Sequence, residues 1–222
     1  MQNPLSTAEF FIHLRQPEKA KIVLDLLKPY ANSIEEINQL GTLYAEIREF
    51  SDSLELAQKI YNLLDDNVDK FDARVNIIRA LLNLNRPIDA LEHILINEQQ
   101  KPNDHPNQMD KAMVYFLLNK KADGEKILRK ILTQPRSKDI DFRVTFNLGT
   151  YDLTNGNFKT GMKHVLVDGK KLNIWETYDL SIPEWQGEVI PNKTILLCSE
   201  AGLGDEIIDI RFQKHIRDLG MN

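Results

Sequence analysis

A small residue that recurs at nearly regular intervals constrains the fold of this chain more than any other feature. Five short polar breaks each end in such a residue, which opens an amphipathic stripe: Ala20, Ser53, Ala90, Gly124 and Gly161. The intervals between these positions are 33, 37, 34 and 37 residues. A second amphipathic segment lies upstream of each break, for example INQLGTLYAEI and FNLGTYDLT. The pattern predicts five units, each a pair of helices.

The small residues indicate that the two helices of each pair cross closely, because a larger side chain would hold their backbones apart. Leu40-Gly41 and Leu148-Gly149 predict the same crowding on the first helix of two pairs. An isolated helix pair cannot bury its apolar face, whereas stacked pairs bury a continuous one and leave a concave surface.

The segments NLG (147–149) and GNFKTG (156–161) together resemble the tetratricopeptide repeat (TPR), and the resemblance covers roughly residues 5–172. It implies an all-α fold, a right-handed helical solenoid of about five helix pairs, which we place at residues 1–177. The intervals depart from the 34 residues of that family, which predicts longer turns in some units. The resemblance also implies that a protein or peptide binds in the concave groove.

In TPR proteins the residue just before the leucine-glycine position faces inward, which identifies Gln39, Asn76, Asp110 and Asn147 as candidate groove residues. Amide side chains suit peptide binding because they offer both a donor and an acceptor. Arg79, one helical turn beyond Asn76, is a candidate contact for a carboxylate. The alternative is that these side chains cap turns or face solvent.

The pattern changes near the C-terminus. Pro183, Gly187 and Pro191 interrupt helix, which predicts a linker at residues 178–192. Residues 194–198, TILLC, read as a short buried strand, and the following glycines, acidic residues and amphipathic stretch read as a turn and a helix that Gly220 closes. We therefore predict one βα unit of a Rossmann-like domain at residues 193–222. The loop is neither the dinucleotide fingerprint nor a P-loop.

The stretch PEWQGEVIPNKTILLCSEAGLGDEI resembles the junction in bacterial TPR-linked, heptosyltransferase-like glycosyltransferases. The resemblance implies that Asp205 is a candidate general base, and that Gly202 and Gly204 keep the backbone close to the donor or acceptor. A nucleotide-sugar would then be the donor. The structural alternative for Asp205 is a helix N-cap.

Two functions therefore stay open. The first is a protein- or peptide-binding TPR scaffold, derived or truncated from a TPR-glycosyltransferase and without complete catalytic machinery. The second is the N-terminal part of a nucleotide-sugar-dependent glycosyltransferase that acts on a protein or glycan acceptor, so the sequence does not decide whether the chain is an enzyme. An exposed strand edge at residues 194–198 would favour self-association or packing against the last helix pair.

Composition and charge exclude several other classes of function. The net charge is −5, from 28 basic and 33 acidic residues that are mixed without a basic block, which makes nucleic acid an unexpected partner. The longest apolar run, AMVYFLL, is too short to cross a membrane. The single cysteine, Cys198, and five dispersed histidines offer no metal-ligand spacing and no internal disulfide. We expect a cytoplasmic protein without a cofactor or metal.

Overall fold

The computed structural model describes residues 4–65, 67–166, 185, 187–196, 207 and 210–221. The chain divides into two units, Met1–Tyr151 and Asp152–Asn222. The division into residues 1–177, 178–192 and 193–222 stays a prediction.

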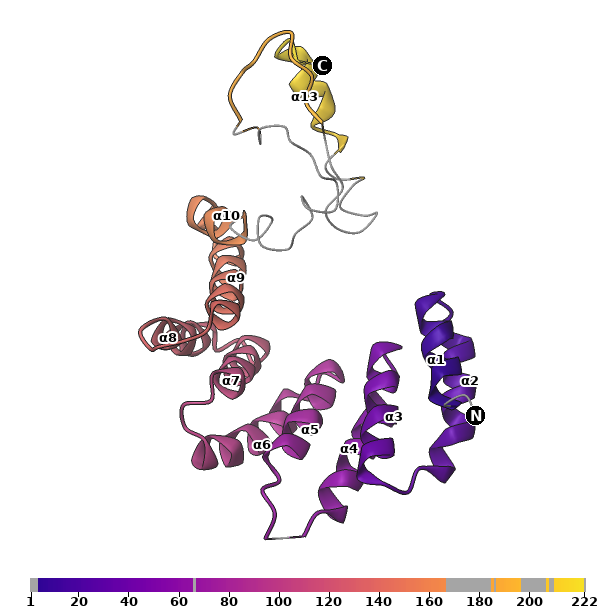
Figure 1. Cartoon of the computed structure of the whole chain (residues 1–222). Helices are drawn as coiled ribbons and strands as arrows, with labels where there is room; N and C mark the ends of the chain where they lie inside the picture. Colours follow the sequence, from indigo (N-terminus) through magenta and orange to yellow (C-terminus); the bar gives the residue numbers. More distant parts are fainter. Residues whose placement is uncertain are drawn as a thin grey trace. The chain divides into compact units, whose positions relative to one another are not determined.

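The first unit is built from helices that follow one another as antiparallel neighbours (Figure 1). The first two pairs are α1 (Pro4–His13) with α2 (Pro17–Leu27), extended by the short 3₁₀ helix η1 (Lys28–Tyr30), and α3 (Ile34–Glu46) with α4 (Phe50–Leu63). The next two are α5 (Phe71–Asn83) with α6 (Pro87–Gln100) and α7 (His105–Leu117) with α8 (Lys121–Leu132). The first unit ends within α9 (Lys138–Thr154), and α10 (Phe158–Leu166) and α13 (Gln213–Asp218) belong to the second unit.

The same turn ends the first helix of all five pairs. A residue with positive φ stands there each time: Arg15, Arg48, Asn85, Asn119 and Gly156. In the second pair, for example, the Arg48 N–H donates to the Ala45 carbonyl at 3.0 Å and the Glu49 N–H donates to the Tyr44 carbonyl at 2.8 Å. These bonds satisfy carbonyls that the helix end leaves open. The five turn residues are spaced by 33, 37, 34 and 37 residues, which are the intervals expected from the small residues.

Each predicted small residue lies five positions after its turn residue, near the start of the second helix of its pair. Ala20, Ala90, Gly124 and Gly161 are buried and Ser53 is partly buried. At Gly124 an added Cβ would lie 2.8 Å from the Phe116 ring and 2.9 Å from the Ala112 carbonyl oxygen, so α7 and α8 touch there. At Gly41, by contrast, an added Cβ would lie 3.6 Å from Leu56, an ordinary contact. The prediction of crowding at Gly41 is therefore wrong.

A capping box and N-terminal prolines mark the starts of three helices. Ser33 and Glu36 form a capping box on α3: the Glu36 N–H donates to the Ser33 hydroxyl at 3.2 Å, and the Ser33 N–H donates to the Glu36 carboxylate at 3.1 Å. Pro17 and Pro87 are the first residues of α2 and α6, where the missing N–H costs nothing.

Among the described residues of the first unit, three buried clusters form the core, and each joins successive pairs. One contains Leu24, Ile37 and Tyr44 from pairs one and two. The next takes Leu54 from α4 and Ile78 and Ile94 from the third pair, together with Val114 from α7. The last combines α7 and α8 with Ile140, Val144 and Leu148 of α9. Stacked pairs thus bury a face that no single pair could bury alone.

The predicted βα unit is wrong. Among the described residues there is no strand, and residues 194–196 of the expected strand adopt no regular secondary structure. An isolated strand leaves its backbone donors and acceptors without a ladder, and one strand with one helix cannot make a sheet. In the second unit residues near 190 instead make single contacts with the chain end: the Asn192 N–H donates to the Gly220 carbonyl at 2.9 Å, and the Ile190 N–H to the Met221 sulfur at 3.4 Å.

Candidate functional site

A hollow between three helices of the first unit is the candidate site. It encloses about 580 Å³, part of which is open solvent. We call it the α3–α5 hollow, and its lining residues are Ile37, Asn38, Gly41, Thr42, Ala45, Phe50, Ser53, Ala57, Ile60, Asn76, Arg79, Ala80 and Asn83. A ligand can occupy about 150 Å³ of it, less than the roughly 300–1,000 Å³ of typical small-molecule pockets, so the hollow suits a side chain or a short stretch of extended peptide.

The hollow combines an apolar base with hydrogen-bonding side chains. Ile37, Ile60 and Ala80 belong to the buried core. Above them, the Asn76 amide nitrogen on α5 donates to the Asn38 amide oxygen on α3 at 3.1 Å. This bond uses one donor of Asn76 and one acceptor of Asn38, and both amides have further groups to offer a ligand.

Polar residues of α5 share one helix face in the hollow. Asn76, Arg79 and Asn83 stand at positions i, i+3 and i+7, which helical geometry places on one side. The Asn83 side chain donates to the Arg79 carbonyl at 2.8 Å, which orients its amide. The exposed Arg79 guanidinium makes no hydrogen bond or ion pair with the part of the chain that the structure describes. The wall therefore carries a cation that no carboxylate of the described chain neutralises by contact.

Asp110, on α7, feels the charge of Arg79. Burial raises the pKa of the Asp110 carboxyl to about 6, although the Arg79 and Arg143 guanidinium groups act in the opposite direction. Asp104, at the start of α7, contributes a smaller upward shift to the same pKa. The pKa of this carboxyl thus stays about 6 although the charges of two arginines act to lower it.

The structure places the predicted groove residues in the same register of four successive pairs. Gln39, Asn76, Asp110 and Asn147 each lie nine residues before the positive-φ residue of their pair. Only Asn76 of these four lines the α3–α5 hollow, together with the predicted Arg79. Gln39 is an exposed residue of α3 whose preceding neighbour, Asn38, takes the lining position, and Asn147 is a half-buried residue of α9.

Sequence reasoning missed Asn38 and Asn83. The signal was present as polar residues at helical spacing: Asn38 and Thr42 are separated by four residues, and Asn76 and Asn83 by seven. A search for polar stripes on the first helices, rather than for one position per repeat, would have found both.

The predicted residues of the C-terminal loop cannot be placed. Gly202, Gly204 and Asp205 lie outside the described residues. Within the ranges that are described, no group of histidine, cysteine, aspartate and glutamate residues could hold a metal ion. Likewise, no helix among the described residues is long and apolar enough to cross a membrane.

Solved structures with similar folds are TPR proteins. TTC0263, a thermophilic TPR protein of Thermus thermophilus, is 18% identical over 80% of this chain and 96% of its own, with a TM-score of 0.56. The TPR-like repeats of a putative kinesin light chain of Podosopora anserina are 13% identical over 78% of this chain and 100% of theirs, with a TM-score of 0.52. A double mutant of MamA RS-1 is 17% identical over 76% of this chain and 93% of its own, also with a TM-score of 0.52.

No protein-family model matches the sequence, and comparison with curated proteins finds no match. Likeness at such low identity shows the fold alone. The repeated helix pairs, the repeated turn and these neighbours together show a TPR-like helical fold. None of the comparisons shows the predicted resemblance to a glycosyltransferase junction.

Proposed function

We propose that this chain is an interaction scaffold that binds an extended segment of a partner protein in the α3–α5 hollow. The observation that carries the proposal is the row of Asn76, Arg79 and Asn83 on one face of α5, opposite Asn38 on α3. Their amides and guanidinium lie over an apolar base, a combination that suits a peptide with both backbone polar groups and side chains.

The amides would act on the peptide backbone. A peptide unit presents one N–H and one C=O, and an asparagine side chain pairs with both. The Asn38–Asn76 bond of 3.1 Å fixes the two amides relative to each other. A bound peptide replaces water at the remaining donors and acceptors, so each hydrogen bond adds only modestly to the affinity. The direction of these bonds fixes the position of the peptide backbone in the hollow.

Arg79 would give the site a charge preference. Its guanidinium has no hydrogen-bond or ion-pair partner in contact among the described residues. We therefore expect an acidic side chain or another carboxylate on the ligand to bind near Arg79. Asp110 and Asn147, in the equivalent register of the next two pairs, are proposed to extend the groove.

The test begins with selection from a random peptide library on the purified chain, followed by calorimetric titration of the selected peptides. Asn76→Ala and Arg79→Ala should each weaken binding by about 10-fold, as expected for lost hydrogen bonds to a desolvated ligand. Arg129→Ala is the matched control, because Arg129 is an exposed arginine on α8 that pairs with Glu125 of its own helix and does not line the hollow. The proposal would be overturned if Asn76→Ala and Arg79→Ala left the peptide affinity unchanged, or if no peptide were selected at all.

Nothing in the described residues favours the transferase alternative. Its candidate base and loop lie outside them, so nucleotide-sugar binding forms no part of the proposal.

A further inference from the structure

The first helix pair carries large apolar side chains on its outer side. Ile22, Leu26 and Tyr30 follow one another on successive turns of α2 and η1 and are 61%, 67% and 77% exposed. On α1, Phe10 and Leu14 are 59% and 50% exposed. We call these five side chains the N-terminal apolar face.

The other sides of α2 are already occupied. Ala20 and Leu24 are fully buried in the core. Asp25 accepts a hydrogen bond from the Tyr44 hydroxyl of α3 at 2.8 Å, and Lys28 pairs with Asp52 of α4 at 2.7 Å. The N-terminal apolar face is therefore the side of the pair that points away from the second pair.

The repeat shows what this side does elsewhere in the chain. Phe10 lies five residues before the turn residue of its pair, and its equivalents Leu43, Ala80 and Val114 are all buried. The equivalents of Ile22 and Leu26 in the second pair are Glu55 and Lys59, and both reach back to the first pair. Glu55 binds Lys28 at 2.6 Å, and Lys59 donates to the Ala31 carbonyl at 3.2 Å. These positions are thus contact positions for a neighbour on this side.

The chemistry at these positions changes in the first pair. The equivalents of Ile22, Leu26 and Tyr30 in pairs two to four are mostly polar: Glu55, Lys59, Leu63, Glu92, Ile96, Gln100, Lys126, Lys130 and Gln134. In the first pair all three are apolar. In the second pair these positions form polar contacts with the preceding pair, as Glu55 and Lys59 show. The N-terminal apolar face lacks such polar groups and therefore requires an apolar partner.

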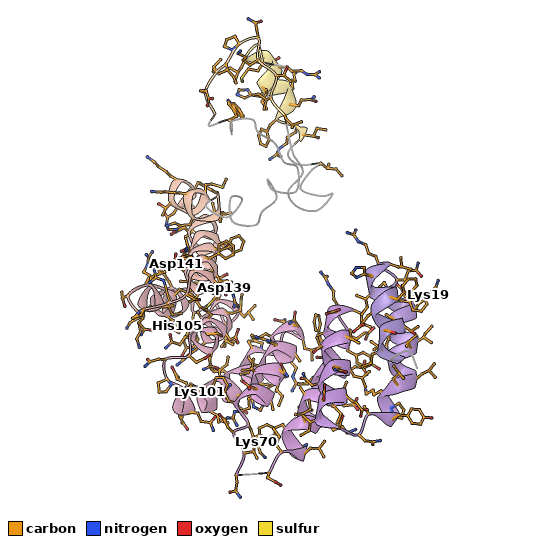
Figure 2. All side chains as sticks on the ribbon, viewed as in Figure 1. Lys19, Lys70, Lys101, His105, Asp139 and Asp141 are labelled. Carbon is orange, nitrogen blue, oxygen red and sulfur yellow. The ribbon has the colours of Figure 1, made fainter. Side chains whose placement is uncertain are left out.

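We propose that two copies of this chain associate through their N-terminal apolar faces. The opposite side of the first pair, with Lys28 and the Ala31 carbonyl, is covered by the second pair of the same chain and is not available to a second copy. The N-terminal apolar face of a second copy offers apolar side chains instead, and a twofold axis brings like surfaces together. Lys19, which lies 5.6 Å from the Phe11 ring and is labelled in Figure 2, and the exposed Glu18 give a rim of opposite charges.

The size of the face agrees with a dimer. At roughly 100 Å² of exposed apolar surface for each side chain, the five together offer roughly 500 Å², at the upper end of patches on ordinary monomers. A standard stable interface buries about 800 Å² per partner, of which somewhat more than half is apolar. The face supplies that apolar share.

Sedimentation velocity of the full chain over a concentration series tests the proposal. We expect a reversible equilibrium between a species of 25.7 kDa and one of twice that mass. Leu26→Glu should weaken dimerisation by about 10-fold or more, because it places a carboxylate in the centre of the interface. Ile96→Glu is the matched control at the equivalent position of α6, and it should leave the equilibrium unchanged. Circular dichroism verifies that both variants keep their helices.

A monomer at every concentration would overturn the proposal, as would a dimer that Leu26→Glu leaves intact or that Ile96→Glu disrupts equally. The peptide-binding proposal is tested separately, because Leu26 does not line the α3–α5 hollow. Leu26→Glu should retain peptide affinity while losing the dimer.

Discussion

Two helical glycines that look alike in the sequence should respond to alanine with opposite sign. At Gly124 the new Cβ would lie 2.8 Å from the Phe116 ring and 2.9 Å from the Ala112 carbonyl oxygen. At Gly41 its nearest neighbour would be the Leu56 Cβ at 3.6 Å. Carbon atoms pack best at about 3.5–4.0 Å, so the first site is too close by roughly 1 Å and the second fits.

The magnitude follows from two opposing contributions. Replacing glycine by alanine inside a helix stabilises the fold by about 1 kcal/mol. At Gly124 the backbone carbonyl of Ala112 retreats only if α7 and α8 separate, and overpacking of this kind costs about 1–3 kcal/mol. We therefore expect Gly41→Ala to raise the free energy of unfolding by about 1 kcal/mol, and Gly124→Ala to lower it by up to about 2 kcal/mol.

Urea unfolding of the two variants and the unmodified chain, followed by circular dichroism, measures the difference. The urea midpoint should rise for Gly41→Ala and fall for Gly124→Ala, and Gly124→Leu should fall further. If Gly124→Ala stabilises the chain as much as Gly41→Ala does, the two helices are not in contact as described, and the reasoning about small residues fails.

Three further predictions concern pH and polar contacts. Folding raises the Asp110 pKa from 3.8 to about 6, so between these pH values the folded chain binds more protons than the unfolded chain. The free energy of unfolding should therefore fall, by up to about 3 kcal/mol, as pH rises through that window. Thermal unfolding at pH 4 and pH 7 measures this loss, which Asp110→Asn should remove. Buried Arg74 donates a hydrogen bond to the Asn97 amide oxygen at 2.6 Å, and Arg74→Met would leave buried Asn97 without that partner. The substitution should lower the free energy of unfolding by about 1–3 kcal/mol, and an unchanged urea midpoint would contradict this. Ser33→Ala should cost about 1 kcal/mol by removing the cap of α3, whereas exposed Ser51→Ala on α4 should not, and equal urea midpoints would argue against the capping box.

The repeat could be predicted from the sequence because its signal is local. A small residue five positions after a helix end reports both the turn and the close approach of two helices, and its spacing needs no knowledge of tertiary structure. The five positive-φ residues follow the same spacing, although three different residue types fill the position, namely arginine at 15 and 48, asparagine at 85 and 119, and glycine at 156. The residue type at this position therefore does not predict the positive φ of the turn.

The site was harder to predict because side chains one residue apart on a helix point about 100° apart. Gln39 and Asn38 differ by that one step, and only Asn38 lines the hollow. Which of them faces the next pair depends on the rotation of α3 against α4 and α5, a consequence of packing that no single-repeat pattern contains.

The strand prediction failed for a similar reason. The stretch TILLC has the composition of a buried strand, but a strand forms only where another strand completes its hydrogen bonds. Composition describes the local preference and says nothing of the partner. Residues 194–196 accordingly adopt no regular structure.

The most direct test of the central claim is an NMR titration of the isotope-labelled chain with a peptide selected on it, following the side-chain amides of asparagine. Our account predicts that the signals of Asn38, Asn76 and Asn83 shift and saturate together, while that of Asn103, in the exposed loop before α7, stays in place. Shifts that leave those three amides unchanged and appear elsewhere would show that the α3–α5 hollow is not the binding site.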